Sequence, residues 1–323
     1  MPQSFRRFVS KRVFYLVITI FLILSFNFLL FRVMPGDITK MRGVSPETGA
    51  LMRDYYGLNS SLPEQYINFL EQTLTGHLGV SISYRVGSEV SSILGPPLTN
   101  TLILVGAGTI LSIAAGTYLG RTTAWHRGKN VDKIGSGFFL IFYCMPTFLF
   151  ALILLQIFAF GIPEWPVRGA TGSDYDFMDI IGKIEDRTLH TLLPLFALVI
   201  ESVAAFSIIV RSSLIDTMTE EYMVTAVAKG LPSRSVLRKH AMPNAMLPVV
   251  TVIAMNVGWI LSGSIMIEVI FSYQGLGYLT YKAVLGYDYP LLQAAFMLEA
   301  VAVVLANFIA DLMLFRLDPR VKL

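Results

Sequence analysis

The sequence predicts an all-α polytopic membrane protein with six transmembrane helices. Hydrophobic residues make up 54% of the chain and charged residues only 15%, whereas soluble globular domains carry roughly 25% charged residues. Six apolar segments are each long enough for the roughly 20 helical residues that cross a bilayer core. A β-barrel would show short alternating segments instead. We therefore expect a single transmembrane domain over residues 1–323.

The predicted spans cover residues 13–34, 97–120, 134–160, 190–210, 246–272 and 290–315. The first span follows a basic start, exceeds the roughly 7–15 apolar residues of a signal peptide and has no small-residue cleavage site, so we interpret it as retained. Pro146 predicts a kink or tilt in the third span, because proline removes a helical hydrogen bond. The only cysteine, Cys144, lies in the same span and is expected to be inert core.

The distribution of lysine and arginine predicts the orientation. Sixteen of the 25 basic residues fall in four connections, which are 1–12, 121–133, 211–245 and 315–323. Positive charge concentrates on the cytoplasmic side of membrane proteins, so both termini are expected to be cytoplasmic. The segments 35–96, 161–189 and 273–289 are then external. The first of these is long enough to form an external subdomain, with a helix expected to start near Leu62.

Residues 211–248 form a long polar and basic connection between two apolar spans. Small residues precede Gly230, and glycine is favoured just after a helix C-terminus. Pro232 stands where a second helix can start. The pattern predicts a short helix, a glycine turn and a second, basic helix. From the residues alone, docking of a partner protein and a solvated loop on the lipid headgroups are equally supported.

Sequence patterns of enzyme chemistry are missing. The nearest approach to a P-loop, Gly128-Lys129-Asn130, lacks the upstream glycine and the hydroxyl residue. The four histidines are scattered, so no metal site is predicted, and no Gly-x-Ser-x-Gly nucleophile elbow occurs. We therefore expect a transport subunit without catalytic residues, metal or cofactor of its own.

Motifs along the whole chain resemble those of one family. Glu221–Leu231 resembles a form of the EAA loop in which the usual glutamate is absent, its position being Val224. Gly76–Ser81 resembles a Gly-Asp-Leu-Gly-x-Ser motif, with His77 in place of aspartate. Further matches are Arg32–Asp37, Pro146–Phe148, Gly275–Gly277, Asp288–Pro290 and Leu317–Arg320. Together they resemble the B-type permeases of the oligopeptide, dipeptide and nickel group of ABC importers.

This resemblance implies a type I importer permease in the cell membrane, carrying di- or oligopeptides. Nickel or oligosaccharides are the alternative cargoes. The implied partners are a paralogous C-type permease subunit, two cytoplasmic ABC ATPases that bind ATP and Mg, and a solute-binding protein that meets segment 35–96; no nucleic acid is implied. Residues 211–248 become the coupling loop, which contacts the ATPases. Its expected contact residues are Tyr222, Thr225, Ala226, Ala228, Lys229, Gly230, Arg234, Arg238 and Lys239.

Charged residues inside spans raise the free energy of membrane insertion, by about 2.5–3.5 kcal/mol for a mid-bilayer aspartate on insertion scales. Glu201 and Glu299 are the deepest. Either can line the translocation path and pair with a peptide amino group, although a hydrogen bond to a neighbouring helix or subunit is the favoured interpretation. The expected outer gate residues are Glu268, Gly275, Gly277 and Asp288. Gly116 and Gly120 form a small-xxx-small pair that predicts close helix packing.

A self-contained secondary transporter or channel is the rival class. Such a protein needs inverted repeats with broken helices at matching positions, and no internal repeat is visible in the sequence. A membrane-embedded protease is a third class, but the spans lack a facing Ser/His or Asp/Asp pair. Both alternatives are therefore less favoured than the importer subunit.

Overall fold

The computed structural model describes residues 3–33, 47, 59–162, 164–247, 249–250, 252 and 265–317. Within these ranges the chain is helical, and its extended pairing is a single antiparallel bridge between Val80 and Glu89. The all-α class is therefore confirmed. The chain divides into two compact units, Met1–Thr101 with Gln274–Phe308 and Leu102–Tyr273 with Ile309–Leu323.

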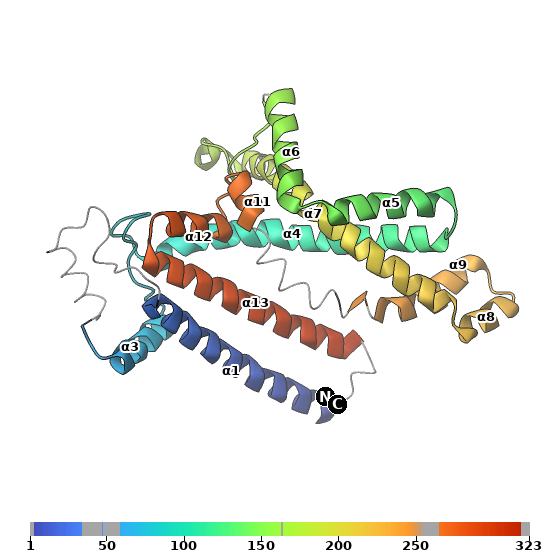
Figure 1. The fold of residues 1–323 in the computed structure, drawn as a ribbon, viewed down its shortest axis with the longest axis horizontal. Helices are drawn as coiled ribbons and strands as arrows, with labels where there is room; N and C mark the ends of the chain where they lie inside the picture. Colours follow the sequence, from blue (N-terminus) through green and yellow to red (C-terminus); the bar gives the residue numbers. More distant parts are fainter. Residues whose placement is uncertain are drawn as a thin grey trace. The chain divides into compact units, whose positions relative to one another are not determined.

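Four long apolar helices match predicted spans (Figure 1). They are α1 (Gln3–Val33), α4 (Val90–Trp125), α7 (Ile180–Met218) and α13 (Tyr289–Leu317). These helices correspond to the first, second, fourth and sixth spans. The fifth predicted span, 246–272, lies partly outside the described residues, and its described C-terminal part includes α11 (Ile265–Ile270).

The third predicted span is broken rather than merely kinked. It consists of α5 (Asn130–Cys144) and α6 (Thr147–Gly161), whose axes differ by 98°. Met145 between them has extended backbone, with φ −81° and ψ 123°, a conformation that the residue before a proline favours. The Pro146 carbonyl then accepts hydrogen bonds from the N–H groups of Leu149 and Phe150 and starts α6. Cys144 lies at this break and is exposed, not in the core as expected.

The first unit pairs α1 with the N-terminal part of α13, which lie side by side in Figure 1. The Asn27 amide donates to the Gln293 carbonyl at 3.3 Å. Helix α3 (Leu62–Thr75) starts where the sequence predicts and packs on α1. In this contact the Ser25 and Tyr66 hydroxyls share a 2.6 Å hydrogen bond. The described part of the predicted external segment is thus attached to the first span.

The second unit is built around α7, on which α5, α6 and α11 pack. Helix α4 approaches α7 most closely at two glycines. A Cβ atom added to Gly120 would lie 2.5 Å from the Ser207 carbonyl oxygen, and one added to Gly116 would lie 2.5 Å from Phe206 Cβ. The Ser207 hydroxyl donates to the Gly116 carbonyl at 3.3 Å. The predicted packing role of the two glycines is confirmed, because side chains would force the helices apart.

Candidate functional site

The coupling loop folds as its sequence predicts. After α7 come α8 (Glu221–Ala228), the short helix α9 (Ser233–Ser235) and the π-helical turn η3 (Val236–Ala241). Gly230 has φ +72°, the left-handed conformation that glycine adopts without a Cβ clash. Its N–H donates to the Val227 carbonyl at 2.9 Å and ends the first helix. The predicted helix, glycine turn and second basic helix are all present.

One face of α8 is buried within the second unit. Met223 and Ala226 are only 4% and 5% exposed. They pack in a cluster with Leu214 of α7 and with Val236 and Ala241 of η3. This cluster attaches the coupling loop to the end of α7. Ala226, an expected ATPase contact, instead faces inward, because it lies three residues after Met223 on the same helix face.

The opposite face of α8 is exposed and largely apolar. Val224 is 66% exposed and Val227 is 62% exposed. Tyr222 is also exposed, as are Thr225, Ala228 and Lys229. Val224 and Val227 were not among the contact residues expected from the sequence. The signal was present, because apolar residues occur on more than one face of this eight-residue helix and a short helix of this kind buries only one face.

Three basic side chains follow α8 in the sequence. Arg234, Arg238 and Lys239 of α9 and η3 are all exposed. Among the described residues, no carboxylate lies within ion-pair distance of these three. The loop therefore presents an apolar helix face followed by three exposed basic side chains. A surface of this kind suits a protein partner that has an apolar groove and acidic residues beside it.

The loop is also attached to the second unit by polar contacts. Arg211, its first residue, makes a two-pronged ion pair with Asp132 of α5, with Nε 2.6 Å from Oδ1 and Nη2 3.0 Å from Oδ2. Asp132 is 5% exposed and also accepts from the Gly128 N–H at 2.9 Å. The Ser213 hydroxyl donates to the Ala245 carbonyl at 2.7 Å. Sequence reasoning missed the ion pair, because the two residues lie in separate polar connections.

The expected gate residue Asp288 holds a loop in the first unit. Its side chain is fully buried. One carboxylate oxygen accepts from the Ser81 hydroxyl at 2.5 Å and from the N–H groups of Ser83 and Tyr84 at 3.0 and 2.9 Å. The motifs 76–81 and 288–290, more than two hundred residues apart, are thereby brought together. A carboxylate satisfied in this way is an anchor for the loop backbone.

The other expected gate residues have separate environments. Gly275 precedes α12 (Leu276–Leu285), whose first N–H donates to the Thr101 hydroxyl at 2.8 Å. Gly277 is buried within α12. Glu268 is fully buried on α11 and belongs to the second unit. Nearby, burial raises the pKa of the Tyr273 phenol, whose hydroxyl lies 3.3 Å from that of Thr191.

The two carboxylates predicted deep in spans also differ. Glu299 of α13 accepts a 3.1 Å hydrogen bond from the Thr280 hydroxyl of α12. This contact fits the favoured interpretation of helix-to-helix bonding. Glu201 of α7 is half-buried and has no hydrogen-bond or ion-pair partner in the described part of the chain.

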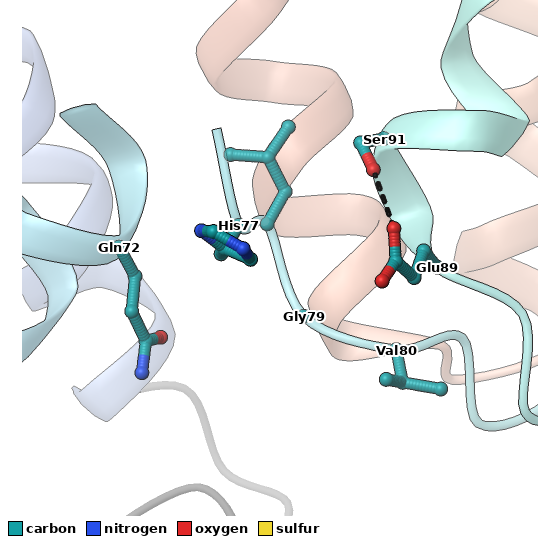
Figure 2. Close-up of a pocket in the computed structure, with 7 residues that line it drawn as sticks. Gln72, His77, Gly79, Val80, Glu89 and Ser91 are labelled. Atoms are coloured by element: carbon teal, nitrogen blue, oxygen red, sulfur yellow. Dashed lines mark hydrogen bonds between the residues drawn. The ribbon is translucent and has the colours of Figure 1, made fainter. Parts of the chain in front are cut away.

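A shallow pocket opens between the end of α3 and the start of α4, with a volume of about 290 Å³. Figure 2 shows the side chains of Gln72, His77 and Glu89 around it. The Ser91 hydroxyl donates to the Glu89 carboxylate at 3.4 Å. The volume of this pocket lies at the lower limit of the roughly 300–1,000 Å³ that ligand pockets span.

The long apolar helices define a multi-pass membrane protein. Residues 108–323 match the family described as the binding-protein-dependent transport system inner membrane component. Residues 5–86 match its N-terminal companion, described as a binding-protein-dependent transport system membrane component. The chain belongs to this family of permeases and is therefore a multi-pass protein of the cytoplasmic membrane.

Curated relatives match over nearly the full length. The chain is 31% identical to the di/tripeptide transport system permease protein DppB of Pseudomonas aeruginosa, covering 98% of both chains. It is 32% identical to the dipeptide transport system permease protein DppB of Escherichia coli K12, again covering 98% of both. It is 30% identical to the oligopeptide transport system permease protein AppB of Bacillus subtilis, covering 92% of this chain and 93% of the relative.

A solved structure shares the fold. The inward-facing MetNI methionine ABC transporter matches 70% of this chain and 97% of its own, with a TM-score of 0.57 and 15% identity. At this identity the match supports the shared permease fold alone.

Proposed function

We propose that this chain is one of two permease subunits of an ATP-driven importer of di- or oligopeptides. The observation that carries the proposal is the full-length match to permeases that are themselves named for dipeptide and oligopeptide transport. Nickel and oligosaccharides, the alternative cargoes of the same importer type, are less supported because these relatives are named for peptide transport. The paralogous C-type subunit forms the other half of the translocation path.

The energy source in this proposal lies in two cytoplasmic ABC ATPases, which bind ATP and Mg. The exposed apolar face of α8, with Tyr222, Val224 and Val227, inserts into the ATPase surface. Arg234, Arg238 and Lys239 then pair with acidic groups around it. Closure of the ATPase pair moves the coupling loop, and alternating access follows as rigid-body motion of the helices.

The proposed topology has six spans and both termini in the cytoplasm. Its support is the excess of basic residues in the four connections of the predicted inner side. With this orientation, the end of α3 and the pocket in Figure 2 face outward. Residues 59–91 contain three glutamates and one arginine, so this surface suits a solute-binding protein with basic residues at its contact.

Reconstitution tests the proposal directly. The chain is purified with the proposed paralogous permease, ATPases and solute-binding protein, and the complex is placed in liposomes. We expect uptake of labelled di- or oligopeptides that requires ATP and binding protein. Nickel ions and oligosaccharides serve as competing cargoes. Uptake by this chain without ATPases, driven by an ion gradient, would indicate a secondary transporter and overturn the proposal.

A further inference from the structure

The Asp132–Arg211 ion pair has more hydrogen bonds than a typical surface ion pair. The two guanidinium bonds measure 2.6 and 3.0 Å. Asp132 also accepts from the Gly128 N–H at 2.9 Å and from the Ser136 hydroxyl at 3.2 Å. The carboxylate is thus surrounded by donors, and both of its oxygens face Arg211.

Such a pair is not an efficient way to stabilise a fold. Taking the Asp132 carboxylate out of water costs free energy that its attraction to the partly exposed Arg211 only partly offsets, and apolar replacements of buried pairs are often neutral or stabilising. What a two-pronged pair provides is a fixed geometry between two elements, because the planar guanidinium matches the carboxylate in one orientation. A role in positioning accounts for its presence better than stability does.

Its location identifies the elements that it fixes. Arg211 is the first residue of the coupling loop and follows the predicted fourth span, 190–210. Asp132 lies in the first turn of α5, just before the predicted third span, 134–160. Helix α5 leads into the break at Met145–Pro146 and then into α6. The ion pair therefore connects the first residue of the coupling loop to helices α5 and α6.

We propose that the Asp132–Arg211 pair is a positioning pair that transmits movement of the coupling loop to α5 and α6. The inference rests on the proposed function, since it requires that ATPases move this loop. The buried cluster around Met223 and Leu214 attaches α8 to the end of α7. Arg211 lies one helical turn before Leu214 on α7. Through Asp132 it transmits the movement of the coupling loop to α5. The break between α5 and α6 lets the two helices change their mutual angle.

The test compares variants in the reconstituted importer with ATPases and binding protein. Asp132→Asn and Arg211→Gln remove one charge each, Arg211→Lys keeps the charge without the two-pronged geometry, and Asp132→Arg/Arg211→Asp exchanges the partners. Asp186→Asn is the matched control. Asp186 lies on the same α7, 3.3 Å from His190, and accepts from the Gly172 N–H, but it is far along the helix from the coupling loop.

Two quantities are measured on assembled complexes, namely ATP hydrolysis stimulated by the binding protein and peptide molecules carried per ATP. Residues along coupling networks change coupling by about twofold to thirtyfold, and we expect a loss in that range for Asp132→Asn, Arg211→Gln and Arg211→Lys. ATPase subunits stay bound in each case. The exchanged pair recovers part of the loss, and Asp186→Asn leaves the ratio unchanged.

A merely structural role gives a different outcome. The variants would then lower the amount of assembled complex, while the complexes that do assemble carry peptide at the wild-type ratio per ATP. That result would overturn the inference but leave the proposed function intact. If the wild-type complex itself showed no ATP-dependent uptake, the proposed function would fail instead, so the two failures are distinguishable.

Discussion

Ser81 and Asp288, 207 residues apart in the sequence, are joined by a 2.5 Å hydrogen bond from the serine hydroxyl to a fully buried carboxylate. The same oxygen accepts the N–H groups of Ser83 and Tyr84. One side chain next to the start of α13 thus holds the backbone of the loop between α3 and α4. The geometry of that loop, including the pocket beside it, depends on Asp288.

Asp288→Asn is therefore expected to loosen this loop. The amide keeps one acceptor oxygen but loses the charge, and hydrogen bonds to charged groups contribute about 1.5–3 kcal/mol each. We expect a lower apparent melting temperature of the purified complex and faster protease cleavage near Arg85. Glu89→Gln is the control, because Glu89 is an exposed carboxylate in the same segment. Equal behaviour of the two variants would contradict the anchoring role.

Gly120→Ala tests the close contact between α4 and α7. The added methyl group would lie 2.5 Å from the Ser207 carbonyl oxygen and 2.8 Å from Val210 Cβ. Because the first of these is backbone, the helices must move apart, and overpacking of this kind typically costs about 1–3 kcal/mol. Gly106→Ala on the same helix meets nothing within 4 Å. Thermal unfolding of the solubilised complex should distinguish the two, with only Gly120→Ala destabilised.

Local patterns in the sequence were sufficient to predict the helices and the turn of the coupling loop. Apolar length predicted the four spans that form single long helices, and Gly230 with Pro232 predicted the break between α8 and α9. Contacts between distant segments were not predictable in this way. No local signal indicates that Asp132 meets Arg211, or that Asp288 accepts from Ser81. The extent of the bend at Pro146 was also missed, because a proline predicts a disturbed helix but the packing of α6 on α7 decides the angle.

Glu201 and Glu299 are expected to respond differently to neutralisation. Glu299 accepts a hydrogen bond from Thr280, and Glu299→Gln retains an acceptor for it, so peptide uptake should change by less than about threefold. Glu201 has no partner in the described part of the chain. If it lines the path, Glu201→Gln should lower uptake of peptides with a free amino terminus more than uptake of N-acetylated peptides. Equal loss for both peptide types would assign Glu201 to packing with the partner subunit.

Gly230 offers the sharpest test of the coupling loop. Its φ of +72° is strained for a residue with a branched side chain, while an added Cβ would meet nothing within 4 Å. A substitution there therefore acts through backbone conformation. Holding a non-glycine residue in the left-handed region costs about 1–3 kcal/mol of folding free energy. Gly230→Val should distort the turn between α8 and α9.

The expected result for Gly230→Val is weaker retention of the ATPases and a loss of ATP-driven peptide uptake, with the chain still inserted in the membrane. Gly230→Asn is the matched control, since asparagine tolerates the left-handed conformation and should keep most of the uptake. Co-purification of the ATPases and uptake per complex are measured for both variants. Wild-type coupling in Gly230→Val would show that the left-handed turn is not needed for docking.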